Sequence, residues 1–159
     1  MYRHRPDPPP APSPSASAAW ARVTVFASAV EASMDKWLAD THRVGLTEYR
    51  ALTFINQTSD KEMRVNELAH RVGLNPSSTT RLVSRLEAKG LARRDVCTDD
   101  GRGVYAVIDE PGITLVREVR APYEARLAEL LREPDAHFPH LDTGRTGSAL
   151  TEIAALIKP

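Results

Sequence analysis

A short polar stretch between Ser77 and Arg85 carries the side chains of this chain that are best suited to bind an anion. Hydroxyl and guanidinium groups donate hydrogen bonds to phosphate oxygens and to the edges of bases. With helical spacing, one arc of this stretch collects Ser77, Ser78, Arg81, Ser84 and Arg85. The opposite arc collects Thr79, Leu82, Val83 and Leu86. We therefore expect a helix with one face in a core and the other against an anionic partner.

The residues before this helix predict another helix, joined to it by a tight turn. Gly73 suits the positive φ that ends a helix, and Asn75 supplies a side-chain oxygen that caps the next one. Pro76 then stands at the first helical position, where its missing N–H costs nothing. This order predicts a helix-turn-helix, which places its second helix in the major groove of DNA.

Two short strands are predicted after the second helix. Gly90 ends the helix, residues 91–96 and 104–108 have strand composition, and residues 98–103 (TDDGRG) are typical of a turn. Arg102 lies at the tip of this turn between two glycines, a position that suits a minor groove better than an ordinary polar turn. A helix-turn-helix followed by a two-stranded wing is the winged-helix arrangement.

The predicted interface with double-stranded DNA combines the polar helix face with the wing. Its residues are Ser77, Ser78, Thr80, Arg81, Ser84, Arg85, Arg94, Asp100 and Arg102. The formal net charge is zero, which argues against nucleic-acid binding by bulk charge. Positive charge is nevertheless concentrated in this region, where a groove would lie. The alternative is a winged-helix module whose arginine face docks on an acidic protein.

The run LNPSSTTRLVSRLEAKGL at residues 74–91, followed by DGRGV at 100–104 and by Gly112, resembles the MarR family of bacterial transcriptional regulators. The resemblance covers residues 46–131. It implies a homodimeric winged-helix repressor or activator that binds a palindromic operator and is controlled by a small molecule; we expect a repressor. By the same resemblance, Asp100 orients Arg102 or pairs with Arg94 across the hairpin.

The length of 159 residues and the 42% hydrophobic content fit one compact domain with appended helices. We expect a mainly α fold with a small β-wing. Residues 1–17, rich in Pro and Ser, are predicted to form a disordered arm. Residues 18–45 are expected to form an N-terminal dimerisation helix, residues 46–108 the DNA-binding lobe and residues 109–159 the C-terminal dimerisation helices.

Helix boundaries are predicted from local capping signals. The periodic helix near the N-terminus spans residues 18–39, Thr47 would cap the second helix, and Asn66 would cap the helix before the turn. Residues 63–65 would add a third strand to the wing. Asp109 would cap the long helix after the wing, residues 133–147 read as a loop, and Ser148 would cap a last helix.

A pocket for a small aromatic or phenolic effector is expected where the terminal helices meet the DNA-binding lobe. The resemblance and the aromatic and basic residues of this region motivate the candidates Arg22, Phe26, Trp37, His42, Arg43, Tyr49 and Phe54. The alternative, at least as well supported, is that the aromatic rings simply fill the core.

Other classes of function find little support. The chain has no nucleophile elbow, no phosphate-binding loop and no dinucleotide fingerprint, so we expect no enzyme and no cofactor. His137 and His140 alone do not make a metal site. Cys97 excludes an internal disulfide and fits a passive strand position better than a redox switch. No apolar run reaches the roughly 18 residues that span a bilayer, so we expect a cytoplasmic protein.

Overall fold

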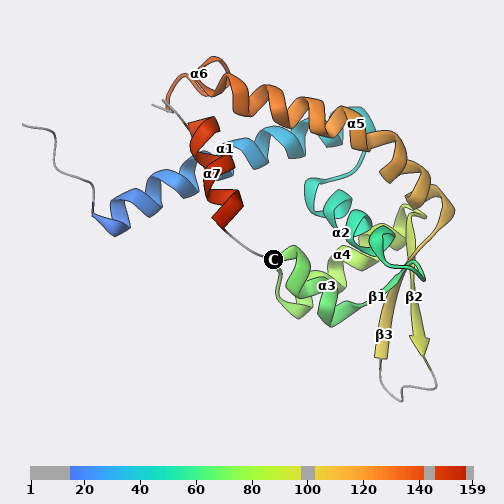
Figure 1. Ribbon diagram of the computed structural model, residues 1–159. Helices are drawn as coiled ribbons and strands as arrows, with labels where there is room; N and C mark the ends of the chain where they lie inside the picture. The colour runs from blue at the N-terminus through green and yellow to red at the C-terminus, as the bar shows by residue number, and fades with distance from the viewer. Residues whose placement is uncertain (1–14, 98–102, 142–145, 157–159) are drawn as a thin grey trace, which may run out of the picture.

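The computed structural model describes residues 15–97, 103–141 and 146–156 (Figure 1). Its elements, in chain order, are α1 (Ala16–His42), α2 (Leu46–Gln57), β1 (Glu62–Arg64), α3 (Val65–Val72), α4 (Pro76–Ala88), β2 (Ala92–Cys97), β3 (Gly103–Ile108), α5 (Glu110–Arg132), α6 (Pro134–His137) and α7 (Thr146–Leu156). The fold is mainly helical with a small antiparallel wing, as the sequence predicts.

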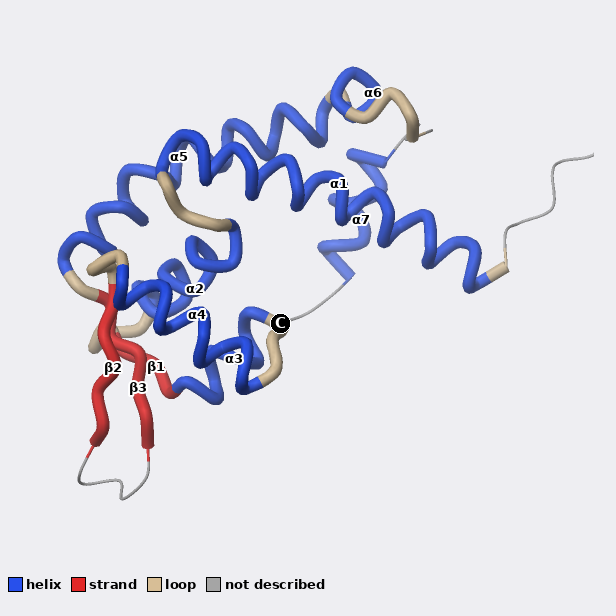
Figure 2. The backbone as a smooth tube through the Cα atoms, turned by 180° about the vertical axis from the view of Figure 1, so that it is seen from behind, coloured by secondary structure: helices blue, strands red, loops and turns tan. Residues whose placement is uncertain are grey.

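The helices form two layers (Figures 1 and 2). The long helices α1 and α5 run side by side, and α2 packs beneath both of them. Helices α3 and α4 and the sheet complete a lobe below α2, from which the wing projects. The first turns of α1 extend past the other helices in both views. The architecture thus separates an elongated helical layer from the lobe that carries the helix-turn-helix.

The wing is a sheet with strand order β1-β3-β2. In the two antiparallel pairings, Met63 lies opposite Ala106, and Arg94 lies opposite Ala106 from the other side. The predicted third strand is confirmed, one residue earlier than expected. Since Met63, Ala106 and Ile108 are buried, the base of the wing belongs to the hydrophobic core.

The helix-turn-helix is confirmed in its details. The Asn75 side chain accepts a hydrogen bond from the Ser78 N–H at 2.8 Å, so Asn75 caps α4, and Pro76 occupies its first turn. Gly73 has φ 72° and Gly90 has φ 68°, the left-handed conformation predicted for both. The predicted apolar arc of α4 enters the core: Thr79, Leu82, Val83 and Leu86 are fully buried.

Three helix starts differ from the predictions. Helix α1 begins at Ala16, because the Ser15 side chain accepts a hydrogen bond from the Ala18 N–H, and it continues to His42. Thr47 does not cap α2, since the helix already begins at Leu46, whose N–H donates to the Asp35 carboxylate at 2.7 Å. Similarly, α3 begins at Val65, before Asn66, directly after strand β1.

The C-terminal part also departs from the predictions. Asp109 occupies the N-cap position of α5 but makes no capping hydrogen bond with its side chain, because its carboxylate pairs with Arg93 of β2. The predicted loop contains the short helix α6, which Pro134 opens. Ser148 does not cap α7, which already begins at Thr146. The predictions for residues 1–14 and for the wing tip, including Asp100 and Arg102, lie outside the described residues.

Candidate nucleic-acid interface

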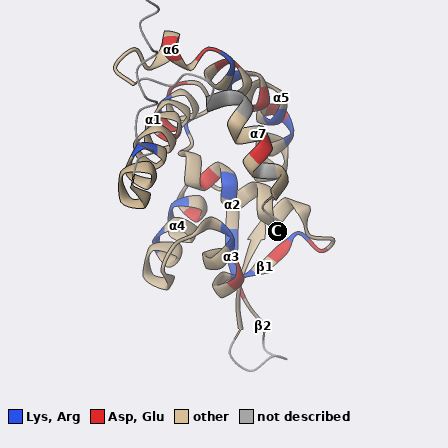
Figure 3. Ribbon diagram, turned by 60° about the vertical axis from the view of Figure 1, so that its left-hand side comes forward, with Lys and Arg blue, Asp and Glu red and all other residues tan. Residues whose placement is uncertain are grey.

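Helix α4 presents its polar face at the surface of the lobe. The exposed residues of this face are Ser77, Thr80, Arg81, Ser84 and Arg85, and Ser78 is half-buried. Lys and Arg mark the outer side of α4 in Figure 3. The structure therefore brings the helix members of the predicted interface together on one exposed surface, since the opposite arc is anchored in the core.

Three hydroxyl groups of this face donate within α4 or to its N-cap residue. Ser77 Oγ donates to Asn75 Oδ1 at 2.9 Å, Thr80 Oγ1 donates to the Pro76 carbonyl at 3.0 Å, and Ser84 Oγ donates to the Thr80 carbonyl at 3.1 Å. A hydroxyl oxygen can also accept hydrogen bonds, as Ser84 Oγ does from Arg94. A hydroxyl that donates to a phosphate must first leave its intrahelical bond, so these residues are weaker donors than the sequence suggests.

Arg81 differs from the other arginines of the surface. Its side chain is exposed and makes no hydrogen bond or ion pair with any residue in the described ranges. All five N–H donors of the guanidinium are consequently available in the arrangement that matches two acceptors at once. Within the described part of the interface, Arg81 has the side chain best prepared for an external anion.

Arg94 of β2 turns back onto α4. Its guanidinium donates to the Thr80 carbonyl at 2.8 Å and to Ser84 Oγ, and it lies 3.7 Å from the Glu87 carboxylate. The backbone N–H of Arg94 also donates to Glu87, at 2.9 Å. Arg94 therefore joins strand β2 of the wing to helix α4.

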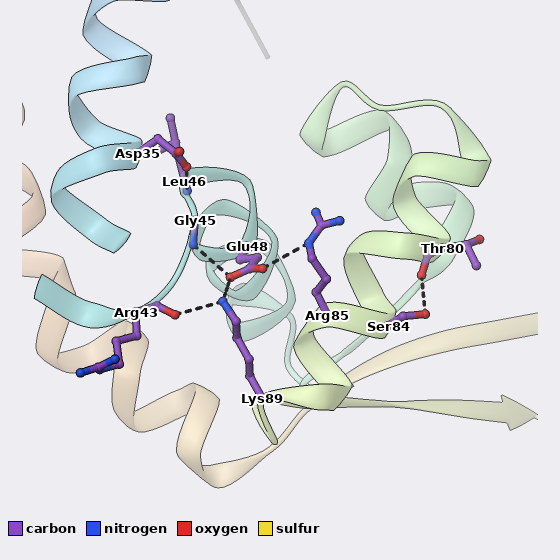
Figure 4. A network of polar contacts seen from close by, with 9 residues as sticks. All are labelled: Asp35, Arg43, Gly45, Leu46, Glu48, Thr80, Ser84, Arg85 and Lys89. Carbon is purple, nitrogen blue, oxygen red and sulfur yellow. Dashed lines mark hydrogen bonds and ion pairs between the residues drawn. The ribbon is translucent and has the colours of Figure 1, made fainter. Parts of the chain in front are cut away.

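A buried carboxylate lies behind the same helix (Figure 4). Glu48, in the first turn of α2, is only 5% exposed and accepts hydrogen bonds from three groups. The donors are Lys89 Nζ at 2.6 Å, the Gly45 N–H at 3.0 Å and Arg85 Nε at 3.3 Å. Lys89 Nζ also donates to the carbonyl of Arg43 at 3.0 Å. One carboxylate thus joins the end of α4 to the corner between α1 and α2.

The surroundings of Glu48 favour its ionised form. Burial raises the pKa of Glu48, but hydrogen bonds from Lys89, the Gly45 N–H and Arg85, with the charge of Lys89, outweigh burial and hold the pKa below its ordinary value of 4.5. The sequence analysis missed Glu48. The available signal was an acid three residues after Gly45, where it can bond the N–H of the residue that precedes a helix.

The predicted effector residues are divided among three aromatic pairs. Phe26 packs edge-on against Phe138 with ring centroids 6.1 Å apart. Trp37 packs against His42 at 5.3 Å, and Tyr49 packs against Tyr123 at 4.8 Å. Burial raises the pKa of the Tyr49 phenol. The remaining candidates belong to none of these pairs: Arg22 and Arg43 are exposed, and Phe54 is partly buried against the core. Their assignment to one pocket stays a prediction.

The described ranges contain neither a candidate metal cluster nor a candidate membrane-spanning helix. Within them, no group of three or more His, Cys, Asp or Glu residues could hold a metal ion. The His137 ring instead lies 3.7 Å from the Glu129 carboxylate. Among the helices that the structure describes, none is both long and apolar enough to cross a membrane.

An exposed recognition helix, a wing and flanking long helices define a winged helix-turn-helix transcriptional regulator. The model of the MarR family matches residues 45–104, which run from the start of α2 into the wing. This part of the chain therefore matches a family of transcriptional regulators.

Solved structures of MarR regulators share this fold. AbsC from Streptomyces coelicolor is 23% identical, with a TM-score of 0.71, and the match covers 94% of this chain and 93% of that chain. Sco3205 from the same organism, solved in complex with DNA, is 21% identical, with a TM-score of 0.71 and coverage of 94% and 89%. CouR from Rhodococcus jostii RHA1, solved with p-coumaroyl-CoA, is 22% identical, with a TM-score of 0.59 and coverage of 67% and 72%.

Proposed function

We propose that the protein is a sequence-specific repressor that inserts α4 into the major groove of a palindromic operator. The observation that carries the proposal is the exposed face of α4, on which Arg81 has all its donors available. The N-terminal end of this helix leads into the groove in helix-turn-helix proteins, and Ser77, Ser78 and Arg81 lie in its first two turns. The DNA complex of the relative Sco3205 supports this assignment.

The proposal includes release of the operator by a small aromatic or phenolic effector. The p-coumaroyl-CoA complex of CouR motivates this choice of ligand chemistry. The aromatic pairs Trp37–His42 and Tyr49–Tyr123 lie on α1, α2 and α5, next to the corner that α4 contacts through Glu48. Because that corner is bonded to α4, a ligand that displaced it would move the recognition helix.

A binding assay with the DNA that flanks the protein's own gene tests both parts of the proposal. We expect a shifted complex that survives excess competitor DNA and weakens steeply as salt rises, because phosphate contacts release counterions. Adding an aromatic acid or its thioester should release the operator. Weak retention that ignores sequence would instead favour a protein-docking module, and retention of the operator in the presence of every aromatic acid would remove the phenolic effector from the proposal.

The proposed assembly is a homodimer that uses the first turns of α1. Trp20 is 67% exposed and Val23 is 50% exposed on the part of α1 that extends past the other helices (Figures 1 and 2). Large apolar side chains gathered on an extended helix indicate an interface. A dimer would also present two recognition helices to the two halves of a palindrome.

Light scattering at micromolar concentration is expected to give twice the mass of one chain. Trp20→Glu should weaken the dimer by about 2 kcal/mol or more, because it places a charge in an apolar contact. Val25→Glu is the matched control, since Val25 is also exposed, at 52%, but lies about 140° round the same helix. A wild-type monomer that still binds the operator would contradict the dimer, and equal effects of the two variants would contradict the assigned face.

A further inference from the structure

We propose that Glu48 is a positioning residue for DNA recognition, because its buried carboxylate orients the Arg85 guanidinium on the exposed face of α4. The inference rests on the proposed function, in which that face meets DNA. Glu48 belongs to α2, and it reaches Arg85 and Lys89 across 37 and 41 residues of sequence. These are contacts between α2 and the recognition helix rather than contacts within one helix.

The contact geometry indicates that Glu48 orients Arg85 rather than competing with DNA for it. Glu48 Oε1 accepts from the Nε of Arg85 only, at 3.3 Å. The two terminal nitrogens of Arg85 lie on the far side of the guanidinium from Glu48 in Figure 4, and the side chain is 53% exposed. A guanidinium held at Nε keeps its terminal donors for a phosphate or a base edge while it loses rotational freedom. DNA that binds Arg85 therefore does not have to break the bond to Glu48.

The second carboxylate oxygen fixes the opposite end of the network. Glu48 Oε2 accepts from both the Gly45 N–H and Lys89 Nζ, and Lys89 also bonds the Arg43 carbonyl at the end of α1. Lys89 caps α4, and Arg43 caps α1 in the left-handed conformation. The carboxylate thus fixes both the arginine and the end of the helix that bears it, and it does so relative to the corner between α1 and α2.

Glu48→Gln separates these two contacts. An amide has one oxygen, so if that oxygen stays with the Gly45 N–H and Lys89, its NH₂ group faces the Nε–H of Arg85, donor against donor. The variant therefore releases Arg85 while the helix end keeps its bonds. Glu31→Gln is the matched control, because it makes the same change in charge at the exposed ion pair with Arg50, which also joins α1 to α2. Added positive charge alone should tighten DNA binding equally in both variants.

The experiment measures operator and competitor affinities of the whole chain as a function of salt, with the melting temperature of each variant. We expect Glu48→Gln to bind the operator about tenfold more weakly than Glu31→Gln, with a smaller preference for operator over competitor. In an Arg85→Gln background, Glu48→Gln should add little, because its effect acts through Arg85. If the role of Glu48 were purely structural, Glu48→Gln would lower the melting temperature but would not change the preference for operator over competitor. Its effect would also be the same with and without Arg85.

Several results would overturn the inference. Glu48→Gln binding as tightly as Glu31→Gln shows that orientation of Arg85 does not matter, and tighter binding shows that Glu48 competes with DNA. If Glu48→Gln lowers operator affinity equally with and without Arg85, Glu48 does not act through Arg85. If Glu48→Gln melts below the assay temperature, the test uses Arg85→Lys instead. Lysine keeps the charge but lacks the Nε–H that Glu48 holds and the forked donors of the guanidinium. Undiminished operator affinity of Arg85→Lys would refute the inference. A wild-type protein with no operator preference would instead refute the proposed function itself.

Discussion

Replacing Gly112 with alanine is expected to lower the free energy of unfolding by about 1–3 kcal/mol, although alanine is the better helix former. Gly112 lies in the first turn of α5, where a Cβ would stand 2.2 Å from the Leu91 carbonyl oxygen and 2.8 Å from Cγ1 of Ile108. The Leu91 carbonyl cannot easily retreat, because it accepts a hydrogen bond from the Asp109 N–H at 3.0 Å. The added methyl group must therefore displace α5 from the base of the wing.

Ala125→Gly provides the opposite exchange at an exposed position of the same helix. Helix propensity alone predicts a loss of about 1 kcal/mol for this control and a gain of similar size for Gly112→Ala. The sign of the change at residue 112, measured by urea denaturation, therefore decides between propensity and close packing. A Gly112→Ala protein as stable as the wild type would mean that α5 does not approach Leu91 as closely as the structure has it.

The helix-turn-helix was predictable because its signals are local. Asn75 caps the helix three residues ahead of the N–H that it bonds, and Gly73 ends a helix by its own conformation. The buried arc of α4 follows from periodicity within thirteen residues. Each of these features depends on neighbours in the sequence, so a single sequence contains the information that they require.

Contacts between distant residues escaped the same reasoning. Helix α2 is capped by Asp35, eleven residues before Leu46, where local rules suggest Thr47 instead. Arg94 bonds Ser84 and Glu48 bonds Lys89 only because the fold brings their elements together. The sequence shows which of these side chains are polar or charged, but it does not show which of them are paired. The exposed face of α4 could therefore be predicted from the sequence, whereas the structure was needed to show that Arg85 and Arg94 are paired and that Arg81 has no partner among the described residues.

The effector candidates illustrate the same limit. Their aromatic character was evident, yet Phe26 and Trp37 stand eleven residues apart on one helix, which separates them by about 16 Å along its axis at the usual rise. Phe26 pairs with Phe138 near α6, whereas Trp37 pairs with His42 at the end of α1. Which aromatic rings pack together depends on how α5 and α6 lie against α1. The periodicity of α1 alone therefore does not show that the effector candidates fall into separate pairs.

Truncating Arg81 to alanine is expected to weaken operator binding by about 1–3 kcal/mol and to reduce discrimination among sequences. The physical reason is that Arg81, unlike Arg85 and Arg94, has no partner in the described part of the chain that already occupies its donors. The residue lies on the exposed arc of α4, between buried Leu82 and the helix start, so its loss opens no cavity. The melting temperature should therefore stay close to that of the wild type.

Two further variants identify what Arg81 contributes. Arg81→Lys keeps the charge but loses the forked donors, so it should keep the salt dependence of binding while losing sequence discrimination. Arg117→Ala removes an exposed arginine from α5, which packs against α1 and α2, and should change neither property appreciably. Competition binding against operator variants, repeated at several salt concentrations, measures both. Base recognition by Arg81 is refuted if Arg81→Lys discriminates as well as the wild type, and DNA contact by α4 is refuted if Arg81→Ala binds the operator with unchanged affinity and salt slope.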